Sequence, residues 1–165
     1  MLVEKITSPL GEIILCAHSS ALRGLWFAGQ KYEGRGAQLC LGESEGDKAV
    51  LERARNWIDA YFSGNEPTID FLLDPQGTAF QKTVWMELLS VPYGETISYG
   101  KLAERIGCKS ARAVGSAVGK NPISLIIPCH RVLGAAGSLT GYAGGVERKA
   151  FLLRLEQDSS GRCDD

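Results

Sequence analysis

Two reactive side chains stand next to each other in the stretch NPISLIIPCHRV, residues 121–132. Cys129 is a nucleophile only as a thiolate, and an ordinary thiol has a pKa of about 8.5, so it needs a nearby base or cation. His130 could be that base. Adjacent side chains in an extended strand point to opposite faces, so we expect a bridging water rather than a direct hydrogen bond. Glu156, on a helix predicted over 146–157, could hold the imidazole in the useful tautomer.

The other cysteines point to no disulfide framework. The chain has five cysteines, an odd number at wide spacings with no C-x-x-C motif, and it begins without a signal-peptide pattern. We therefore expect free thiols in the cytoplasm. The structural cysteines would be Cys16, Cys40, Cys108 and Cys163. With only two histidines, a zinc site is disfavoured, and no cofactor motif is present, so we expect neither a metal nor a cofactor. No apolar run reaches the length of a membrane span.

Charge is divided unevenly along the chain, although the net charge is only −1. Residues 98–155 contain nine Lys and Arg against two Asp and Glu, a balance of +7, whereas residues 1–97 carry −5. This indicates either attraction of a polyanion to the C-terminal half or a scattered, solvated basic face.

The first part of the chain predicts a small α/β domain over residues 1–74. Strand-like runs at 2–7, 12–18 and 22–27 are separated by tight turns, and a short strand is predicted at 69–73. Between them, apolar residues from Val50 to Phe62 recur at helical spacing, with Asp47 as the expected N-cap and Gly64 as the stop. The turn DPQG, residues 74–77, marks the boundary.

The second part, residues 78–158, predicts a helical domain. Thr78 and Gln81 form a capping box, Ser98 can cap a short helix over 99–106, and Ser110 can cap another that runs to Gly119. Two short helices joined by a tight turn fit either a helix-turn-helix or a plain helical hairpin. Residues 159–165 are predicted to be a disordered tail.

One face of the helix predicted from Ser110 to Gly119 is unusually smooth. Val114, Ala117 and Val118 can face the core, and the opposite face carries Arg112, Gly115, Ser116 and Gly119. Glycine costs about 1 kcal/mol in a helix relative to alanine. Such a face suits close approach of a nucleic acid, or close packing against another helix.

Taken as a set, these motifs resemble the O6-alkylguanine-DNA alkyltransferases, the methylated-DNA–protein-cysteine methyltransferases. The resemblance runs through FQKTVWMELLSVPYGETISYGKLAERIG and ARAVGSAVGKNPISLIIPCHRVLGAAGSLTGYAGGVERKAFLL. It implies an α+β fold, with a small N-terminal α/β domain that is ribonuclease-H-like and a winged helix-turn-helix-like alkyltransferase domain behind it.

The resemblance also implies roles for individual residues. Cys129 matches the alkyl acceptor, activated through water by His130 and Glu156. Asn121 matches the residue that supports the loop beside the cysteine, and Tyr99 the tyrosine that helps to rotate the nucleotide and supports departure of guanine. Residues implied to contact DNA are Ser98, Tyr99, Ala111, Arg112, Gly115 and Ser116, with Arg112 filling the gap in the base stack. Residues implied for the base pocket are Val132, Tyr142, Ala143 and Ser124.

The implied activity is direct reversal of O6-alkylguanine, and of O4-alkylthymine, in double-stranded DNA. The protein is implied to act as a monomer that binds the duplex in the minor groove and flips the damaged base out of it. The thioether formed on Cys129 inactivates the protein after one turnover. Two rivals stay open. A Cys-His-Asn hydrolase would regenerate free Cys129, and a helix-turn-helix regulator would work without it.

Overall fold

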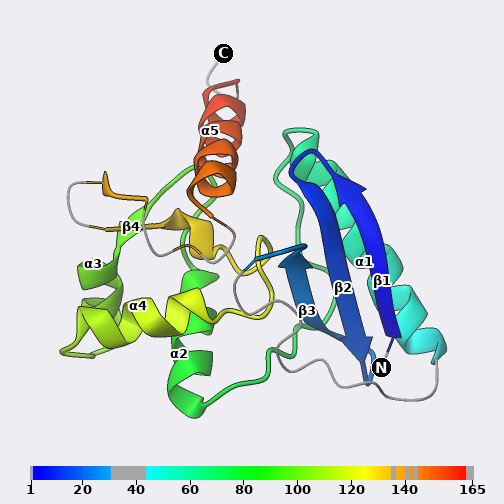
Figure 1. Cartoon of the computed structure of the whole chain (residues 1–165), viewed down its shortest axis with the longest axis horizontal. Helices are drawn as coiled ribbons and strands as arrows, with labels where there is room; N and C mark the ends of the chain where they lie inside the picture. Colours follow the sequence, from blue (N-terminus) through cyan, green and yellow to red (C-terminus); the bar gives the residue numbers. More distant parts are fainter. Residues whose placement is uncertain (1, 31–43, 135–136, 140–141, 143–144, 163–165) are drawn as a thin grey trace. The chain divides into compact units, whose positions relative to one another are not determined.

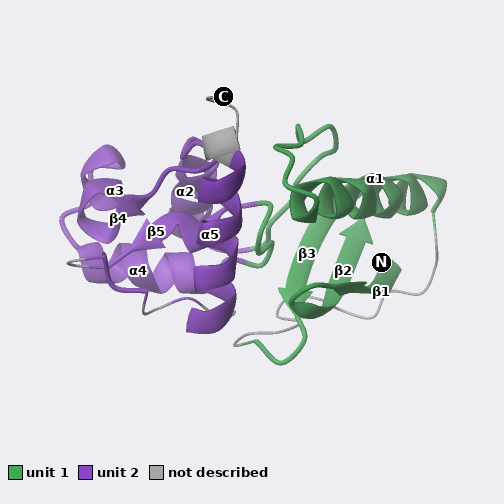
Figure 2. Ribbon diagram, turned by 90° about the horizontal axis from the view of Figure 1, so that it is seen from above, with its two compact units in different colours: residues 1–76, 122–126 green, residues 77–121, 127–165 purple. Residues whose placement is uncertain are grey.

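The chain folds into two units. The computed structural model describes residues 2–30, 44–134, 137–139, 142 and 145–162. The first unit comprises residues 1–76 and 122–126, and the second comprises 77–121 and 127–165 (Figure 2). The boundary near residue 76 lies close to the predicted one. The short segment 122–126 is a difference, because it folds with the first unit although both its neighbours belong to the second.

A three-stranded antiparallel sheet forms the first unit, in the order β1 (Leu2–Ser8), β2 (Gly11–His18), β3 (Ala21–Phe27). Ser19 and Ser20 both have positive φ, at 53° and 60°, as a two-residue hairpin turn requires. Helix α1 (Glu45–Phe62) packs on one face of this sheet and buries its apolar stripe there (Figure 1).

The N-terminus of α1 differs from the prediction. Ser44, not Asp47, is the N-cap, and its hydroxyl accepts a hydrogen bond from the Asp47 N–H at 3.0 Å. The Asp47 side chain instead accepts from the backbone N–H of Ser20, at 2.8 Å in the β2–β3 turn. A tertiary partner thus takes the carboxylate that the local sequence offers as a cap.

The strand predicted at 69–73 is also wrong. Among the described residues this segment makes a single bridge to β3, Leu22 with Leu73, supported by two backbone hydrogen bonds of 2.8 Å. A second single bridge, Leu25 with Ile123, lies further along the same strand. The edge of β3 is therefore shared by two segments, and neither is long enough to make a regular ladder.

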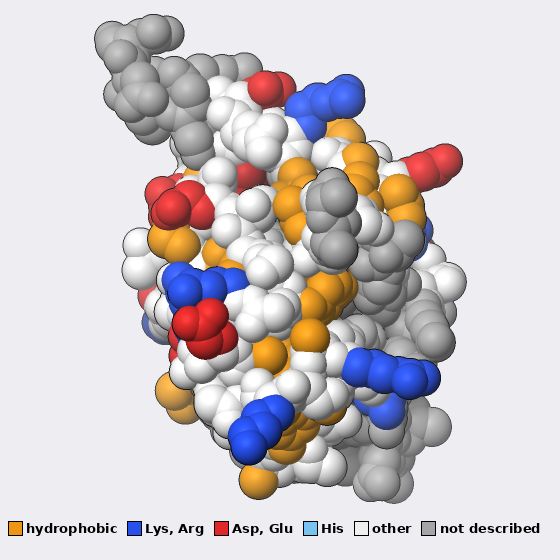
Figure 3. All heavy atoms as spheres, turned by 90° about the vertical axis from the view of Figure 1, so that its left-hand side faces the viewer, with side chains coloured by type: hydrophobic (Ala, Val, Ile, Leu, Met, Phe, Trp, Pro, Cys, Tyr) orange, Lys and Arg blue, Asp and Glu red, His pale blue; other side chains and the backbone are white. Residues whose placement is uncertain are grey.

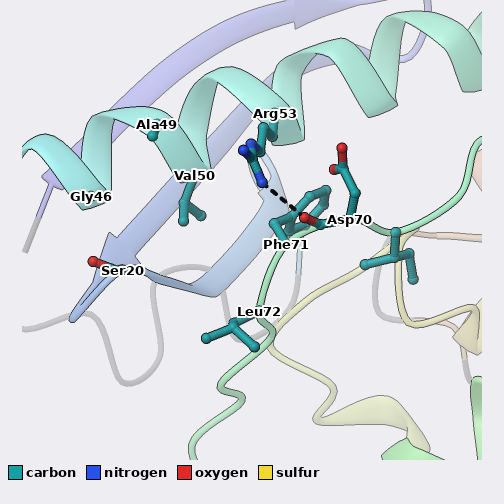
Figure 4. Close-up of a pocket in the computed structure, with 9 residues that line it drawn as sticks. Ser20, Gly46, Ala49, Val50, Arg53, Asp70, Phe71 and Leu72 are labelled. Carbon is teal, nitrogen blue, oxygen red and sulfur yellow. Dashed lines mark hydrogen bonds between the residues drawn. The ribbon is translucent and has the colours of Figure 1, made fainter.

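A cavity of about 440 Å³ opens in the first unit between α1 and the segment 69–72 (Figure 4). Arg53 crosses it, donating from Nη1 to the Asp70 carbonyl oxygen at 3.1 Å. Its lining includes Ser20, Val50, Phe71 and Leu72, and it contains neither cysteine nor histidine. The thiol chemistry that the sequence predicts therefore does not belong to this cavity.

Helices dominate the second unit. Its elements are α2 (Ala79–Leu88), β4 (Ile97–Ser98), α3 (Tyr99–Arg105), α4 (Ala111–Gly119), a 3-10 turn η1 (Cys129–Arg131), β5 (Val132–Leu133) and α5 (Val146–Arg162). The predicted capping box of α2 is present, and Ser98 and Ser110 cap α3 and α4 through hydrogen bonds of 3.0 and 3.1 Å. The parallel pair β4–β5 places the start of α3 beside the end of η1.

Helix α4 of the helix-turn-helix pair packs on both α3 and α2. Val114, Ala117 and Val118 of α4 are buried as predicted, and Trp85 of α2 donates from Nε1 to the Ala117 carbonyl oxygen at 2.8 Å. The α+β fold class is confirmed. The predicted tail is partly wrong, because α5 continues to Arg162; residues 163–165 lie outside the described chain. Within the described residues, none of the helices is both long and apolar enough to span a membrane.

Candidate functional site around Cys129

Turns, rather than the strand suggested by the apolar run, lead the backbone into Cys129. Pro128 has φ −79° and ψ 64°, and the Cys129 N–H donates to the Ile127 carbonyl oxygen at 2.8 Å. These values define an inverse γ-turn. The chain then enters η1, in which successive side chains are about 120° apart, so Cys129 and His130 do not point to opposite faces as an extended strand would require. Both side chains are buried.

Asn121 holds the turn that precedes the cysteine. Its Nδ2 donates to the Ile127 carbonyl oxygen at 2.9 Å, and its side chain is buried. The same carbonyl oxygen accepts from the Cys129 N–H, so one oxygen ties the asparagine to the backbone of the nucleophile. The resemblance implies that Asn121 supports the loop beside the cysteine, and this hydrogen bond is a contact through which it could do so.

A buried network stands behind His130. Its Nε2 lies 2.5 Å from Oε2 of Glu156, and the other carboxylate oxygen accepts from Arg131 Nε at 2.7 Å and from the Gly94 N–H at 3.1 Å. Arg131 also donates from Nη1 to the Val91 carbonyl oxygen at 2.7 Å. The predicted pair His130–Glu156 is thus present, and Arg131 completes it.

The charged groups of this network are the Glu156 carboxylate and the Arg131 guanidinium. Burial opposes ionisation of Glu156, but the hydrogen bonds and charges of His130 and Arg131 outweigh it and hold the Glu156 pKa at about 2. Burial lowers the pKa of His130, and Glu156 offsets this only in part. At neutral pH the imidazole is therefore neutral. Because Nε2 must donate to the ionised carboxylate, Nδ1 is the basic nitrogen of the ring.

The depressed Glu156 pKa predicts an acid-dependent loss of stability. A carboxylate whose pKa falls on folding, here from 4.5 to about 2, stabilises the protein fully above the higher value and loses that contribution as the pH falls between the two. We expect the free-energy difference between wild type and Glu156→Gln, measured by denaturant unfolding, to shrink by up to about 3 kcal/mol across this window.

Glu147→Gln, a substitution on the exposed side of the same helix, is the control and should leave the acid profile of the wild type. A difference between wild type and Glu156→Gln that stays constant from pH 5 to acid unfolding would contradict the assigned charge state.

The pKa values of two tyrosines, Tyr99 and Tyr142, are raised by burial and in part by the charge of Cys129. Burial and then the thiolate raise the pKa of Tyr99, and the same causes raise the pKa of Tyr142 well above its ordinary value. Both therefore keep their phenolic protons at neutral pH. The Tyr142 hydroxyl is buried and has no hydrogen-bond partner among the described residues, so it is an available donor or acceptor beside the thiol.

A residue that the sequence reasoning missed is Lys149 on α5. Lys149, Leu152, Glu156 and Ser159 form the buried stripe of this helix. Lys149 Nζ is fully buried and donates to the Val132 carbonyl oxygen at 2.5 Å. Burial lowers its pKa, and the Cys129 thiolate partly offsets this. The signal was available, since Lys149 precedes Glu156 by seven residues and must share its helix face.

The predicted DNA face lies on α3 and α4. Ala111, Arg112 and Ser116 are exposed, and Ser98 is exposed at the start of α3. Gly115 lies beside the aromatic ring of Tyr99, where an added Cβ would be 3.5 Å from a ring carbon. Figure 3 shows the side of the molecule on which α3 and α4 lie. Among the described residues drawn there, the Lys and Arg side chains are separate from one another and have acidic side chains near them.

The remaining predicted pocket residues lie in different places. Val132 is buried at the start of β5, and its backbone N–H donates to the Cys129 carbonyl oxygen. Ser124 belongs to the first unit, where its hydroxyl meets the Gln30 side chain. Ala143 lies outside the described residues.

Within the described ranges, no group of three or more His, Cys, Asp or Glu side chains could hold a metal ion.

Comparison with known proteins agrees with this geometry. Residues 1–75 match the 6-O-methylguanine DNA methyltransferase ribonuclease-like domain, and residues 79–158 match the 6-O-methylguanine DNA methyltransferase DNA binding domain. A methylated-DNA–protein-cysteine methyltransferase of Mycobacterium tuberculosis is 46% identical over 92% of this chain and 90% of its own length. The protein of that name from Methanosarcina barkeri is 44% identical over 96% of this chain and 99% of its own length.

Solved structures give the same result. The crystal structure of M. tuberculosis OGT in complex with DNA matches with a TM-score of 0.83 at 44% identity, covering 95% of this chain and 93% of that one. An O6-methylguanine DNA methyltransferase from Methanococcus jannaschii matches with a TM-score of 0.67 at 27% identity, covering 93% of each chain. The resemblance seen in the sequence is confirmed: the chain belongs to the 6-O-methylguanine DNA methyltransferase family.

Proposed function

We propose that this protein repairs DNA by moving the alkyl group of O6-alkylguanine, and of O4-alkylthymine, onto Cys129. The observation that carries the proposal is the buried thiol of Cys129 next to His130, whose Nε2 is engaged by ionised Glu156. This arrangement leaves Nδ1 as a base that can take the thiol proton through one water molecule. The family membership and the DNA-bound M. tuberculosis structure support the same reaction.

The transfer is a displacement at carbon. The Cys129 thiolate attacks the alkyl carbon, a carbon–sulfur bond forms, the bond to O6 breaks, and the electron pair leaves with guanine. Tyr99 keeps its proton because of its raised pKa, so it can donate a hydrogen bond to the leaving base. We expect the carbonyl oxygens of Cys129 and Val132 to accept hydrogen bonds from the guanine amine. A thioether is not reversed by thiol exchange, so each protein acts once.

Docking uses the smooth face of α4. Arg112 and Ser116 are exposed there, and Gly115 leaves space beside Tyr99. Because the charged side chains in Figure 3 are scattered, we expect this face to bind DNA more through close contact with the groove than through a strong positive potential. Close contact suits the narrow minor groove, where the base edges distinguish the base pairs poorly. We expect the protein to act as a monomer.

Turnover number distinguishes this function from its rivals. With an excess of duplex containing O6-methylguanine, we expect product to plateau at one methyl group per protein and unmodified guanine to appear in equal amount. A Cys-His-Asn hydrolase would pass the plateau and regenerate its thiol. A helix-turn-helix regulator with an inert cysteine would bind the duplex and transfer nothing. Either result would overturn the proposal.

A further inference from the structure

The segment Pro122–Ile126, just upstream of the cysteine, is attached to β3 of the first unit. Leu25 donates from its N–H to the Pro122 carbonyl oxygen, and its own carbonyl accepts from the Ser124 N–H, both at 2.9 Å. The segment is buried throughout. It is therefore held by the sheet of the first unit through its backbone.

A buried polar pair fixes the middle of this segment. Gln30 Nε2 and Oε1 lie 3.3 and 3.4 Å from the Ser124 hydroxyl, and Oε1 also accepts from the Phe27 N–H at 2.7 Å. Both side chains are at least 94% buried. In a buried setting an amide and a hydroxyl that satisfy each other specify one arrangement, because every alternative leaves a polar group unpaired.

Directly after Ser124 the backbone is strained. Leu125 has φ 71°, a region that L residues other than Asn and Asp rarely adopt, and the Ile126 N–H donates to the Ser124 carbonyl oxygen at 2.8 Å. A positive φ with this i to i+2 hydrogen bond is a γ-turn of the strained hand. Such a conformation persists only where its surroundings hold it.

The strained turn leads into the turn that carries the nucleophile. Ile127 is the next residue but one, and its carbonyl oxygen accepts both from Asn121 Nδ2 and from the Cys129 N–H. A change of Leu125 to negative φ would rotate the peptide groups that follow it in the chain, and the Ile127 carbonyl belongs to one of them. We therefore expect the backbone at Cys129 to respond to the conformation at Leu125.

We propose that Gln30 and Ser124 are positioning residues for the alkyl transfer: the first unit holds the Leu125 turn through this pair and so fixes the backbone that presents Cys129. The inference rests on the proposed role of Cys129 as acceptor. It gives the first unit a task in the reaction.

The test compares Ser124→Ala, Gln30→Ala and the double variant. The readouts are the maximal transfer rate from a free O6-alkylguanine base, the half-saturating concentration of that base, and the affinity for duplex DNA. We expect each single variant to lower the maximal rate about tenfold, with the half-saturating concentration and DNA affinity unchanged. The double variant should slow transfer no more than Gln30→Ala alone, because the interaction that Ser124→Ala removes is already lost in Gln30→Ala. Gln30→Ala also loses the bond from the Phe27 N–H, so it should be the slower of the two single variants.

Asp47→Ala is the matched control. It removes another hydrogen bond made by a buried residue of the first unit, the one from the Ser20 N–H to the Asp47 carboxylate, without touching residues 122–126. At a similar loss of thermal stability it should transfer at the wild-type rate. Equal slowing by Asp47→Ala, or an unchanged rate in Ser124→Ala, the mildest change, would overturn the inference. If the wild-type protein carried no alkyl group on Cys129 after reaction with the free base, the proposed function would be overturned, and this inference with it.

Discussion

Replacing Arg112 with alanine should slow repair of a lesion in duplex DNA by about a hundredfold, because flipping a base costs a few kcal/mol and something must fill the vacated stack. Arg112 is exposed near the start of α4, on the face proposed to enter the groove. A free O6-alkylguanine base has no stack to leave. Its reaction should therefore be slowed only slightly, and the ratio of the two rates is the measurement.

Arg154→Ala supplies the control for lost positive charge. Arg154 is exposed on α5 and takes no part in the proposed docking face. It should leave both rates near the wild type. If Arg112→Ala slowed transfer from the free base as much as transfer from duplex, the arginine would support the fold or the thiol, and the stack-filling role would be wrong.

Replacing Lys149 with methionine should lower transfer from both substrates by about tenfold to a hundredfold, because a charge-assisted contact near the thiolate is lost. The buried ammonium and the Cys129 thiolate favour each other's charged forms, as the influence of Cys129 on the Lys149 pKa shows. The lysine also orients the Val132 carbonyl oxygen, which is proposed to bind the guanine amine.

Stability should respond differently from activity in this variant. Methionine has a similar length and removes the cost of burying a charge, which offsets the loss of one hydrogen bond. We expect the midpoint of thermal unfolding to stay within a few degrees of the wild type. Arg154→Met removes an exposed cation from the same helix and should transfer normally. Transfer from free base by Lys149→Met at the wild-type rate would refute the role given to the lysine.

Local signals in the sequence predicted the local structure well. Ser98 and Ser110 cap α3 and α4, and Thr78 with Gln81 forms the capping box of α2, because each bond joins residues only three apart. Asp47 was misjudged for the opposite reason. Its carboxylate can cap a helix, but a partner 27 residues away competes for it, and sequence spacing does not reveal such a partner.

The apolar run Leu125–Ile127 shows where periodicity fails. A short apolar run predicts a buried strand, but hydrophobic residues indicate only that a segment is buried and not which backbone φ it adopts. Here the run is interrupted by a γ-turn at Leu125 and leads into a second one at Pro128, so its backbone is not extended. Lys149 was missed although its helical spacing from Glu156 was a signal, because charged side chains are usually exposed. The contact of Arg131 with Glu156 joins residues 25 apart in the sequence, and spacing does not reveal such a partner.

The central claim, that Cys129 is the alkyl acceptor, is tested most directly by mass mapping. The protein is mixed with an equimolar O6-methylguanine duplex, digested, and the position of the added methyl group is read from peptide masses, with Cys129→Ala treated in parallel. We predict one methyl group per protein, located on Cys129, and none in Cys129→Ala. An unchanged mass in the wild type, or a methyl group on Cys108 or any other residue, would contradict the account.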